Sequence, residues 1–136
     1  MSHHDRVTTL CVDDEKRVLV VRQMVLESAG YTVLTADTVL KALELFKNRD
    51  VDLVITDYFL QCETGSDLAV ELRKLSRSVP IMVLTGAVEF NGCVDPPDYY
   101  LHKLEGPAKM IAKVRSIMGT SVKGLTTSSA IPKEPI

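Results

Sequence analysis

Short apolar runs alternate along the chain with longer segments in which apolar residues recur every three or four positions. The short runs are rich in Val, Ile, Leu and Thr, which is typical of strands buried in a sheet. The longer segments have the period of amphipathic helices. This alternation predicts an α/β fold in which helices cover both faces of a parallel sheet, with right-handed crossovers. Five strands are expected, at Val7–Val12, Tyr31–Ala36, a run within Val51–Leu60 that ends at Asp57, Pro80–Thr85 and Tyr99–Lys103.

The first predicted helix follows Asp14 and is closed by Gly30, which suits a C-cap because glycine tolerates a positive φ. Its expected buried stripe comprises Val18, Val21, Val25 and Ala29. Leu19, Val20 and Met24 lie off this stripe, so apolar side chains are left toward solvent. Two interpretations stay open for these three residues: partial burial by neighbouring elements, or an exposed docking patch.

Three further helices have clear apolar faces. Asp37 or Thr38 is the expected N-cap of the first of them, and Pro107 suits the first turn of the last. Val88–Asp98 shows no helical period and contains two prolines, so the helix that would be fourth in order is predicted to be short or missing. The three apolar faces are marked by Val39, Ala42, Leu43 and Phe46, by Leu68, Leu72 and Leu75, and by Ile111, Val114 and Met118.

Composition and charge narrow the class of protein. The chain has 136 residues, 46% hydrophobic, which fits one domain at 7–119 between a disordered start at 1–6 and a flexible tail or linker at 120–136. With a net charge of −2 and no long apolar stretch, neither direct nucleic-acid binding nor membrane insertion is expected. Three cysteines without a CxxC pattern indicate reduced packing residues of a cytoplasmic protein; they are Cys11, Cys62 and Cys93.

Polar residues stand where the predicted strands end. Asp13 and Asp14 follow the first strand, Asp57 ends the third, Thr85 ends the fourth and Lys103 ends the fifth. In an open parallel sheet, ligands bind at the carboxyl ends of the strands, near the point where the strand order reverses. The sequence therefore predicts that these five side chains converge on one site.

Electrostatics indicates what such a site holds. Two carboxylates about 5 Å apart repel by roughly 3 kcal/mol at an effective dielectric constant of 20. A divalent cation and an ammonium group relieve this repulsion, and carboxylates with a few waters suit Mg²⁺. A carboxylate nucleophile, Mg²⁺, a lysine and a threonine hydroxyl are together the groups needed to receive a phosphoryl group.

Four segments carry a resemblance to a known family: "CVDDE" (Cys11–Glu15), "DLVITDYFL" (Asp52–Leu60) followed by Gly65, "IMVLTGA" (Ile81–Ala87) and "DYYLHK" (Asp98–Lys103). In these segments, and over about Val7 to Met118, the chain resembles the receiver domain of two-component response regulators of the chemotaxis-regulator type. The resemblance implies a flavodoxin-like, doubly wound sheet of five parallel strands in the order 2-1-3-4-5.

The resemblance also implies roles for individual residues. Asp57 would accept a phosphoryl group from a sensor histidine kinase or a phosphotransfer protein, and the only catalysis would be this phosphorylation and its reversal by hydrolysis. Lys103 and Thr85 would contact the phosphoryl oxygens, and Thr85 with Tyr100 would form a switch read by a downstream protein or an output domain. Tyr100 also fits a plain packing role. Mg²⁺ would be held by Asp13, Asp14, Asp57 and the backbone carbonyl of Phe59.

Departures from the family leave two alternatives open. Gln61 and Leu104 stand where the family usually has proline, and Val88–Asp98 is several residues shorter than is usual in the family. Leu104 and this short segment leave open a degenerate receiver that binds proteins without being phosphorylated. The other is a phosphatase of the haloacid-dehalogenase type, against which Phe59 argues, because those enzymes have a second Asp at that position. No G-x-x-x-x-G-K-[ST] nucleotide-binding loop is present.

Overall fold

The computed structural model describes residues 6–58, 65–86 and 99–119, and within them the sheet and helices follow the predicted order. All five strands are parallel, in the order β2-β1-β3-β4-β5, which confirms the flavodoxin-like topology. The strands are β1 (Thr8–Val12), β2 (Thr32–Ala36), β3 (Leu53–Asp57), β4 (Ile81–Thr85) and β5 (Tyr99–His102). The helices are α1 (Lys16–Ser28), α2 (Val39–Asn48), α3 (Gly65–Leu75) and α4 (Gly106–Gly119), preceded by a 3₁₀ turn at Lys103–Glu105.

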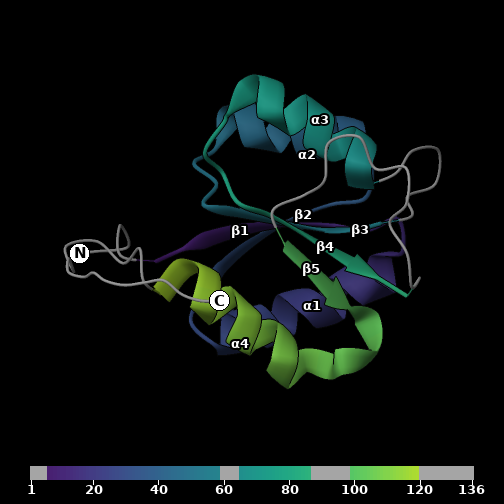
Figure 1. The fold of residues 1–136 in the computed structure, drawn as a ribbon, viewed down its shortest axis with the longest axis vertical. Coiled ribbons are helices and arrows are strands. Elements are labelled where there is room, and N and C mark those ends of the chain that lie inside the picture. Colours follow the sequence, from purple (N-terminus) through teal and green to yellow (C-terminus); the bar gives the residue numbers. More distant parts are fainter. Residues whose placement is uncertain (1–5, 59–64, 87–98, 120–136) are drawn as a thin grey trace.

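Helices cover both faces of the sheet, and the central strands are buried between them. In Figure 1, α2 and α3 lie on one face and α1 and α4 on the other. Every residue of β3 is buried, because successive side chains enter opposite layers of the core. Val54 packs in the layer under α2 and α3, whereas Leu53 and Ile55 pack in the layer under α1 and α4.

Local signals set the ends of several helices as the sequence predicts. Thr38 is the N-cap of α2, and its hydroxyl accepts a hydrogen bond from the Lys41 backbone N–H at 3.0 Å. Gly30 follows α1 with φ +99°, a conformation that other residues rarely adopt. β5 ends one residue earlier than predicted, at His102, and Lys103 begins the 3₁₀ turn.

The predicted buried stripe of α1 is only partly correct: Val25 packs against the core, but Val21 does not. Leu19 is 6% exposed and belongs to the core, whereas Val21, predicted to be buried, is 58% exposed. The buried residues of this helix are Leu19, Arg22 and Leu26. Arg22 lies at the centre of this stripe. Because the prediction used apolar positions alone, it placed the buried stripe on the neighbouring face of the helix. Val20 and Met24 are exposed, as expected from the sequence.

Several expectations fall on residues outside the described ranges. These are the missing or short helix at Val88–Asp98, the flexible ends before residue 6 and at 120–136, and the packing roles of Cys62 and Cys93, which all stay predictions. Cys11 is a free, fully buried thiol, and burial raises its pKa to about 12, as expected of a packing residue.

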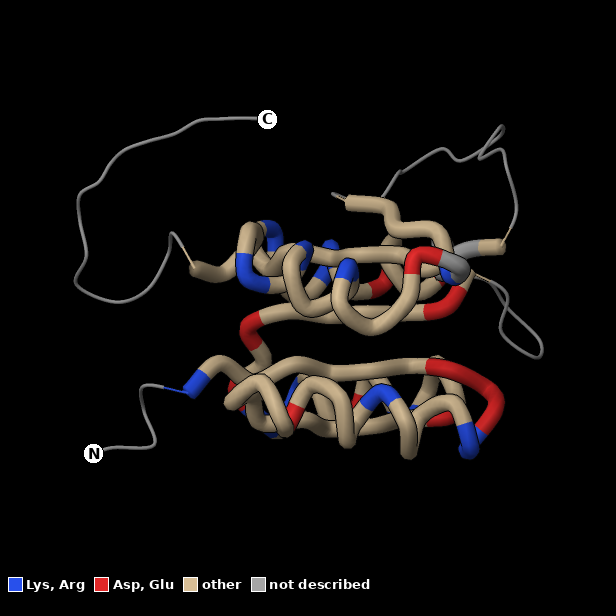
Figure 2. The backbone as a smooth tube through the Cα atoms, turned by 90° about the horizontal axis from the view of Figure 1, so that it is seen from below, with Lys and Arg blue, Asp and Glu red and all other residues tan. Residues whose placement is uncertain are grey.

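The surface of the described part carries both charges. Basic and acidic positions are interspersed along the tube in Figure 2, in keeping with 16 Lys and Arg against 18 Asp and Glu in the whole chain. None of the helices within residues 6–58, 65–86 and 99–119 has the length and apolar character needed to cross a membrane.

The corrected stripe of α1 predicts different effects for two neighbouring substitutions. Leu19→Ala removes buried methyl groups and leaves a cavity, so it should lower the free energy of unfolding by about 2 to 4 kcal/mol. Val21→Ala removes exposed atoms and should change it by less than about 0.5 kcal/mol. Urea unfolding followed by circular dichroism measures both. Equal effects of the two variants would contradict the observed orientation of α1.

Candidate functional site

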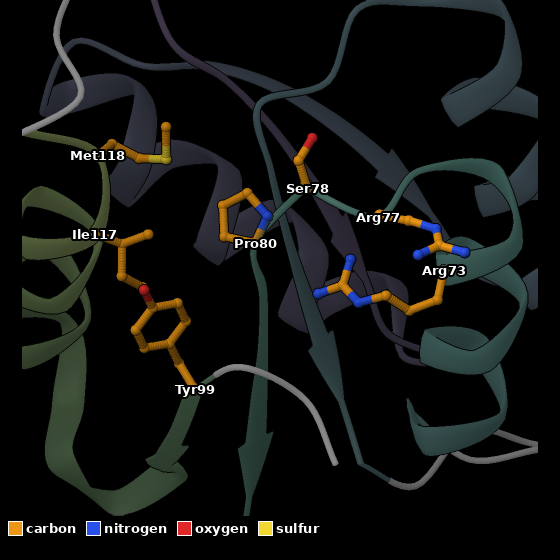
Figure 3. A pocket seen from close by; sticks show the side chains of 7 residues that line it. All are labelled: Arg73, Arg77, Ser78, Pro80, Tyr99, Ile117 and Met118. Atoms are coloured by element: carbon orange, nitrogen blue, oxygen red, sulfur yellow. The ribbon is translucent and has the colours of Figure 1, made fainter. Parts of the chain in front are cut away.

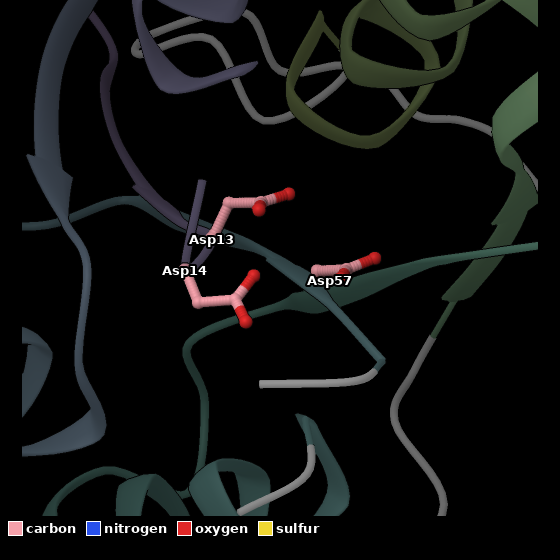
Figure 4. A group of neighbouring side chains, drawn as sticks. All are labelled: Asp13, Asp14 and Asp57. Atoms are coloured by element: carbon pink, nitrogen blue, oxygen red, sulfur yellow. The ribbon is translucent and has the colours of Figure 1, made fainter. Parts of the chain in front are cut away.

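The pairing of β1 with β3 brings three carboxylates together. Val12 pairs with Thr56 in the parallel ladder, so Asp13, which follows β1, lies beside Asp57 at the end of β3. Asp14 lies next along the chain, and Figure 4 shows the three side chains at the same end of the sheet. One oxygen from each carboxylate lies within 4.8 Å of the other two. The predicted convergence of these three residues is therefore present.

The three carboxylates differ in their exposure to solvent. Asp13 is 2% exposed and Asp57 is 5% exposed, whereas Asp14 is open to solvent. Two buried carboxylates side by side are unfavourable unless cations compensate them. Positively charged groups are therefore favoured next to these carboxylates.

Lys103 supplies one positive charge directly to Asp57. Its Nζ lies 2.6 Å from Oδ1 of Asp57, and among the described residues this buried oxygen has no other hydrogen-bond partner. No peptide bond of the described residues is cis, so the bond from Lys103 to Leu104 is trans. Leucine in place of the family's proline therefore does not turn the lysine away from the acidic residues.

The pKa of Asp57 is raised above its ordinary value. Burial is the largest cause, the hydrogen bond from Lys103 opposes it, and the charge of Asp13 raises the pKa further. A raised pKa means that folding favours the protonated carboxyl. This contribution to stability is present at low pH and is lost as the pH rises through the raised pKa. An ionised Asp57 therefore needs more compensating positive charge than Lys103 alone supplies.

Two hydrogen bonds hold the Asp13 carboxylate, one from the turn before α1 and one from α1 itself. Its Oδ1 accepts the Glu15 backbone N–H at 2.9 Å, and its Oδ2 accepts a hydrogen bond from Nη1 of Arg22 at 3.3 Å. Arg22 is 9% exposed, so this is a buried ion pair. Sequence reasoning missed Arg22. Its spacing of three and four residues from Leu19 and Leu26 is the signal that would have placed it on the buried face.

The remaining predicted site residues are described in part or not at all. Thr85 ends β4 and pairs with His102 of β5, but its side chain lies outside the description, as does all of Phe59. Tyr100 is partly buried and packs against the core layer under α2 and α3. Its packing role is thus present, and its role as a switch stays a prediction.

The acidic group fits a hard divalent cation. It offers three carboxylates, and oxygen is the ligand atom that Mg²⁺ prefers, at roughly 2.1 Å in an octahedral arrangement. Ligands on opposite sides of such an ion lie about 4.2 Å apart, which is within the 4.8 Å that limits the separations here. Oδ1 of Asp57 is buried and short of hydrogen bonds, which is a second feature of a cation site.

A groove at the other end of the sheet is separate from these residues. It has a volume of about 650 Å³ and lies between the end of α3, the residue before β4, the start of β5 and the end of α4. Figure 3 shows the side chains that line it. They are Arg73, Arg77, Ser78, Pro80, Tyr99, Ile117 and Met118.

The chain matches a known protein family over most of its length. The family model described as the response regulator receiver domain matches residues 9–115. The phosphate regulon transcriptional regulatory protein PhoB of Pseudomonas aeruginosa is 30% identical over 117 residues, which are 82% of this chain and 51% of that protein. The transcriptional regulatory protein CusR of Escherichia coli is 34% identical over 113 residues, 80% of this chain and 50% of that protein. The chain thus spans about half the length of these relatives.

Solved structures are similar in fold. The chemotaxis protein CheY4 of Vibrio cholerae has a TM-score of 0.78 at 24% identity, and the match covers 82% of this chain and 98% of that one. The response regulator TrrA of Thermotoga maritima, in complex with Mg²⁺–BeF, has a TM-score of 0.76 at 27% identity, with the same coverage of 82% and 98%.

The buried pair predicts that two neighbouring aspartates differ in their effect on stability. Asp13→Asn leaves Arg22 buried without its carboxylate, and breaking a buried pair typically costs about 3 to 5 kcal/mol. Relief of the repulsion with Asp57 offsets part of this, so we expect a loss of roughly 2 to 3 kcal/mol. Asp14→Asn is the matched control and should change stability by less than about 0.5 kcal/mol.

Urea unfolding in EDTA measures both variants without metal ions. A loss in Asp14→Asn as large as that in Asp13→Asn would contradict the structural role assigned to the Arg22–Asp13 pair.

Proposed function

The chain belongs to the response regulator receiver domain family, and on that premise we propose that Asp57 accepts a phosphoryl group from a sensor histidine kinase or a phosphotransfer protein. The observation that carries the proposal is the position of Asp57 between Asp13, Asp14 and the Lys103 ammonium. These are a nucleophile, two oxygen ligands and a fixed cation, which phosphoryl transfer to a carboxylate requires.

The transfer needs placement and charge neutralisation but no general base. An oxygen of the Asp57 carboxylate attacks the phosphorus of a phosphohistidine, and the phosphorus–nitrogen bond breaks as the imidazole leaves. Asp57 is thereby converted to an acyl phosphate. Water later attacks this phosphorus, which releases inorganic phosphate and restores the carboxylate. The domain thus catalyses only its own phosphorylation and dephosphorylation.

Each charged residue has a proposed part in this chemistry. Asp13 and Asp14, with Asp57, would hold Mg²⁺, and when bound this ion would neutralise charge on the phosphoryl oxygens. Lys103 now contacts Oδ1 of Asp57, so a short movement would bring its ammonium onto a phosphoryl oxygen. Thr85 as a hydroxyl donor and the Phe59 carbonyl as a metal ligand are proposed from the family resemblance. The Mg²⁺–BeF complex of TrrA supports metal dependence here.

The proposed output is a change of surface rather than a chemical product. The phosphoryl group carries about −1.5 to −2 charges where the Asp57 carboxylate carried one, and this added charge can draw the segment after β4 toward Asp57 and alter what the surface binds. Tyr100 would move with this segment. PhoB and CusR are named as transcriptional regulatory proteins, and they extend to about twice the matched length. A downstream protein or an output domain outside this chain would therefore read the change.

Exposed apolar residues on α1 are the proposed contact for the phosphoryl donor. Val20, Val21 and Met24 are all exposed on this helix, which begins two residues after Asp14. Burial of such side chains is a common source of binding energy between proteins.

Two general expectations accompany this function. The signalling would take place in the cytoplasm. The domain would span residues 7–119, with flexible segments on either side.

The phosphoacceptor is tested directly by mass spectrometry. After incubation with Mg²⁺ and acetyl phosphate, the parent protein should gain about 80 Da, the mass of one phosphoryl group. Asp57→Asn should gain nothing, because its amide is not a nucleophile. Asp50→Asn, which changes an exposed aspartate before β3, is the matched control and should be labelled like the parent.

Two results would overturn the proposal. Persistent labelling of Asp57→Asn would move the acceptor elsewhere. No labelling of the parent by acetyl phosphate or by a phosphorylated donor protein would favour a receiver that binds partners without phosphorylation.

A further inference from the structure

Arg22 is an unusual residue for its position. It lies on the buried stripe of α1, between Leu19 and Leu26, with 9% of its surface exposed. An apolar side chain would fill this position without loss of hydration, whereas a guanidinium there is costly unless it meets a negative charge. The arginine reaches the acidic residues, with Nη1 at 3.3 Å from Oδ2 of Asp13. Its location therefore points to a role at the site rather than in packing alone.

The pair with Arg22 leaves Asp13 with both oxygens engaged by α1 and its leading turn. Oδ1 accepts the Glu15 backbone N–H, and Oδ2 accepts the guanidinium N–H. These contacts fix the orientation of a carboxylate that is 2% exposed. Any cation that binds Asp13 therefore meets an oxygen that already accepts a hydrogen bond, and at Oδ2 it competes with the Arg22 guanidinium.

The formal charges of the pocket are nearly balanced without a metal ion. Asp13, Asp14 and Asp57 carry three negative charges, and Lys103 and Arg22 supply two positive ones. Burial raises the pKa of Asp57, and Arg22 is among the cations that oppose this. Without Arg22, the pocket would face an incoming cation with twice the excess negative charge.

We propose that Arg22 is a positioning residue that competes with a divalent cation for Asp13. It holds Asp13 in place when no metal ion is present and lowers the affinity of the pocket for Mg²⁺. The phosphoryl group restores the negative charge that Arg22 offsets, so Mg²⁺ binds more tightly to the phosphorylated domain. This inference rests on the proposed role of Asp13 as a metal ligand.

The test measures Mg²⁺ affinity by isothermal titration calorimetry on the unphosphorylated protein. Arg22→Met keeps the length and packing of the side chain but removes its charge, so we expect Mg²⁺ to bind about tenfold more tightly than in the parent. Arg22→Lys keeps the charge and should stay within about threefold of the parent. A gain of affinity is not what damage to the fold would produce.

Two further variants complete the experiment. Arg17→Met removes an equal charge from the exposed side of the same helix and should change Mg²⁺ affinity less than about twofold, because water screens it. If Arg22→Met does not fold, Arg22→Gln gives the same comparison.

Unchanged or weaker Mg²⁺ binding in the charge-removing variants Arg22→Met and Arg22→Gln would overturn the inference while leaving the proposed function intact, provided that acetyl phosphate still labels Asp57 in the parent. A parent protein that neither binds Mg²⁺ nor is labelled would overturn both.

Discussion

Parallel pairing of β1 with β3 forces two buried carboxylates to the same end of the sheet. Asp13 and Asp57 are 2% and 5% exposed, so water solvates neither carboxylate well. Because these carboxylates repel each other, the surrounding elements must provide positive charge. β5 and its following turn bring the Lys103 ammonium to Asp57, and α1 brings the Arg22 guanidinium to Asp13. One negative charge stays in excess, which is the condition for binding a further cation.

Different residues stabilise the fold and form the candidate site. Two apolar layers, one on each face of the sheet, hold the strands in register, and residues of β1 and β3 are shared between them. Charged side chains begin where β1 and β3 end, so the chemistry occupies one end of the sheet and the preceding strand residues carry no charge. The groove at the opposite end is formed by other segments, so the two ends of the sheet can serve different contacts.

The sequence predicted the sheet, its strand ends and the convergence of Asp13, Asp14, Asp57 and Lys103, because strand ends are marked by an abrupt change from apolar to charged residues. It failed on α1, where Arg22 occupies a buried position that apolar periodicity alone assigns to solvent. Burial of an arginine depends on a partner from outside its own helix, which periodicity does not contain. The bond from Lys103 to Leu104 is trans, and the lysine still reaches Asp57, so the missing proline does not disturb this contact. The roles of Thr85 and Phe59 stay predictions.

The central claim is that the acidic residues share one divalent cation beside the Lys103 ammonium. Crystals soaked in Mn²⁺, which takes the same octahedral oxygen ligands as Mg²⁺ and scatters anomalously, test it most directly. We expect one strong anomalous peak within about 2.3 Å of carboxylate oxygens from both Asp13 and Asp57, close to those of Asp14. A pocket that stays free of Mn²⁺ at saturating concentration, with Asp57 bound to Lys103 alone, would contradict it.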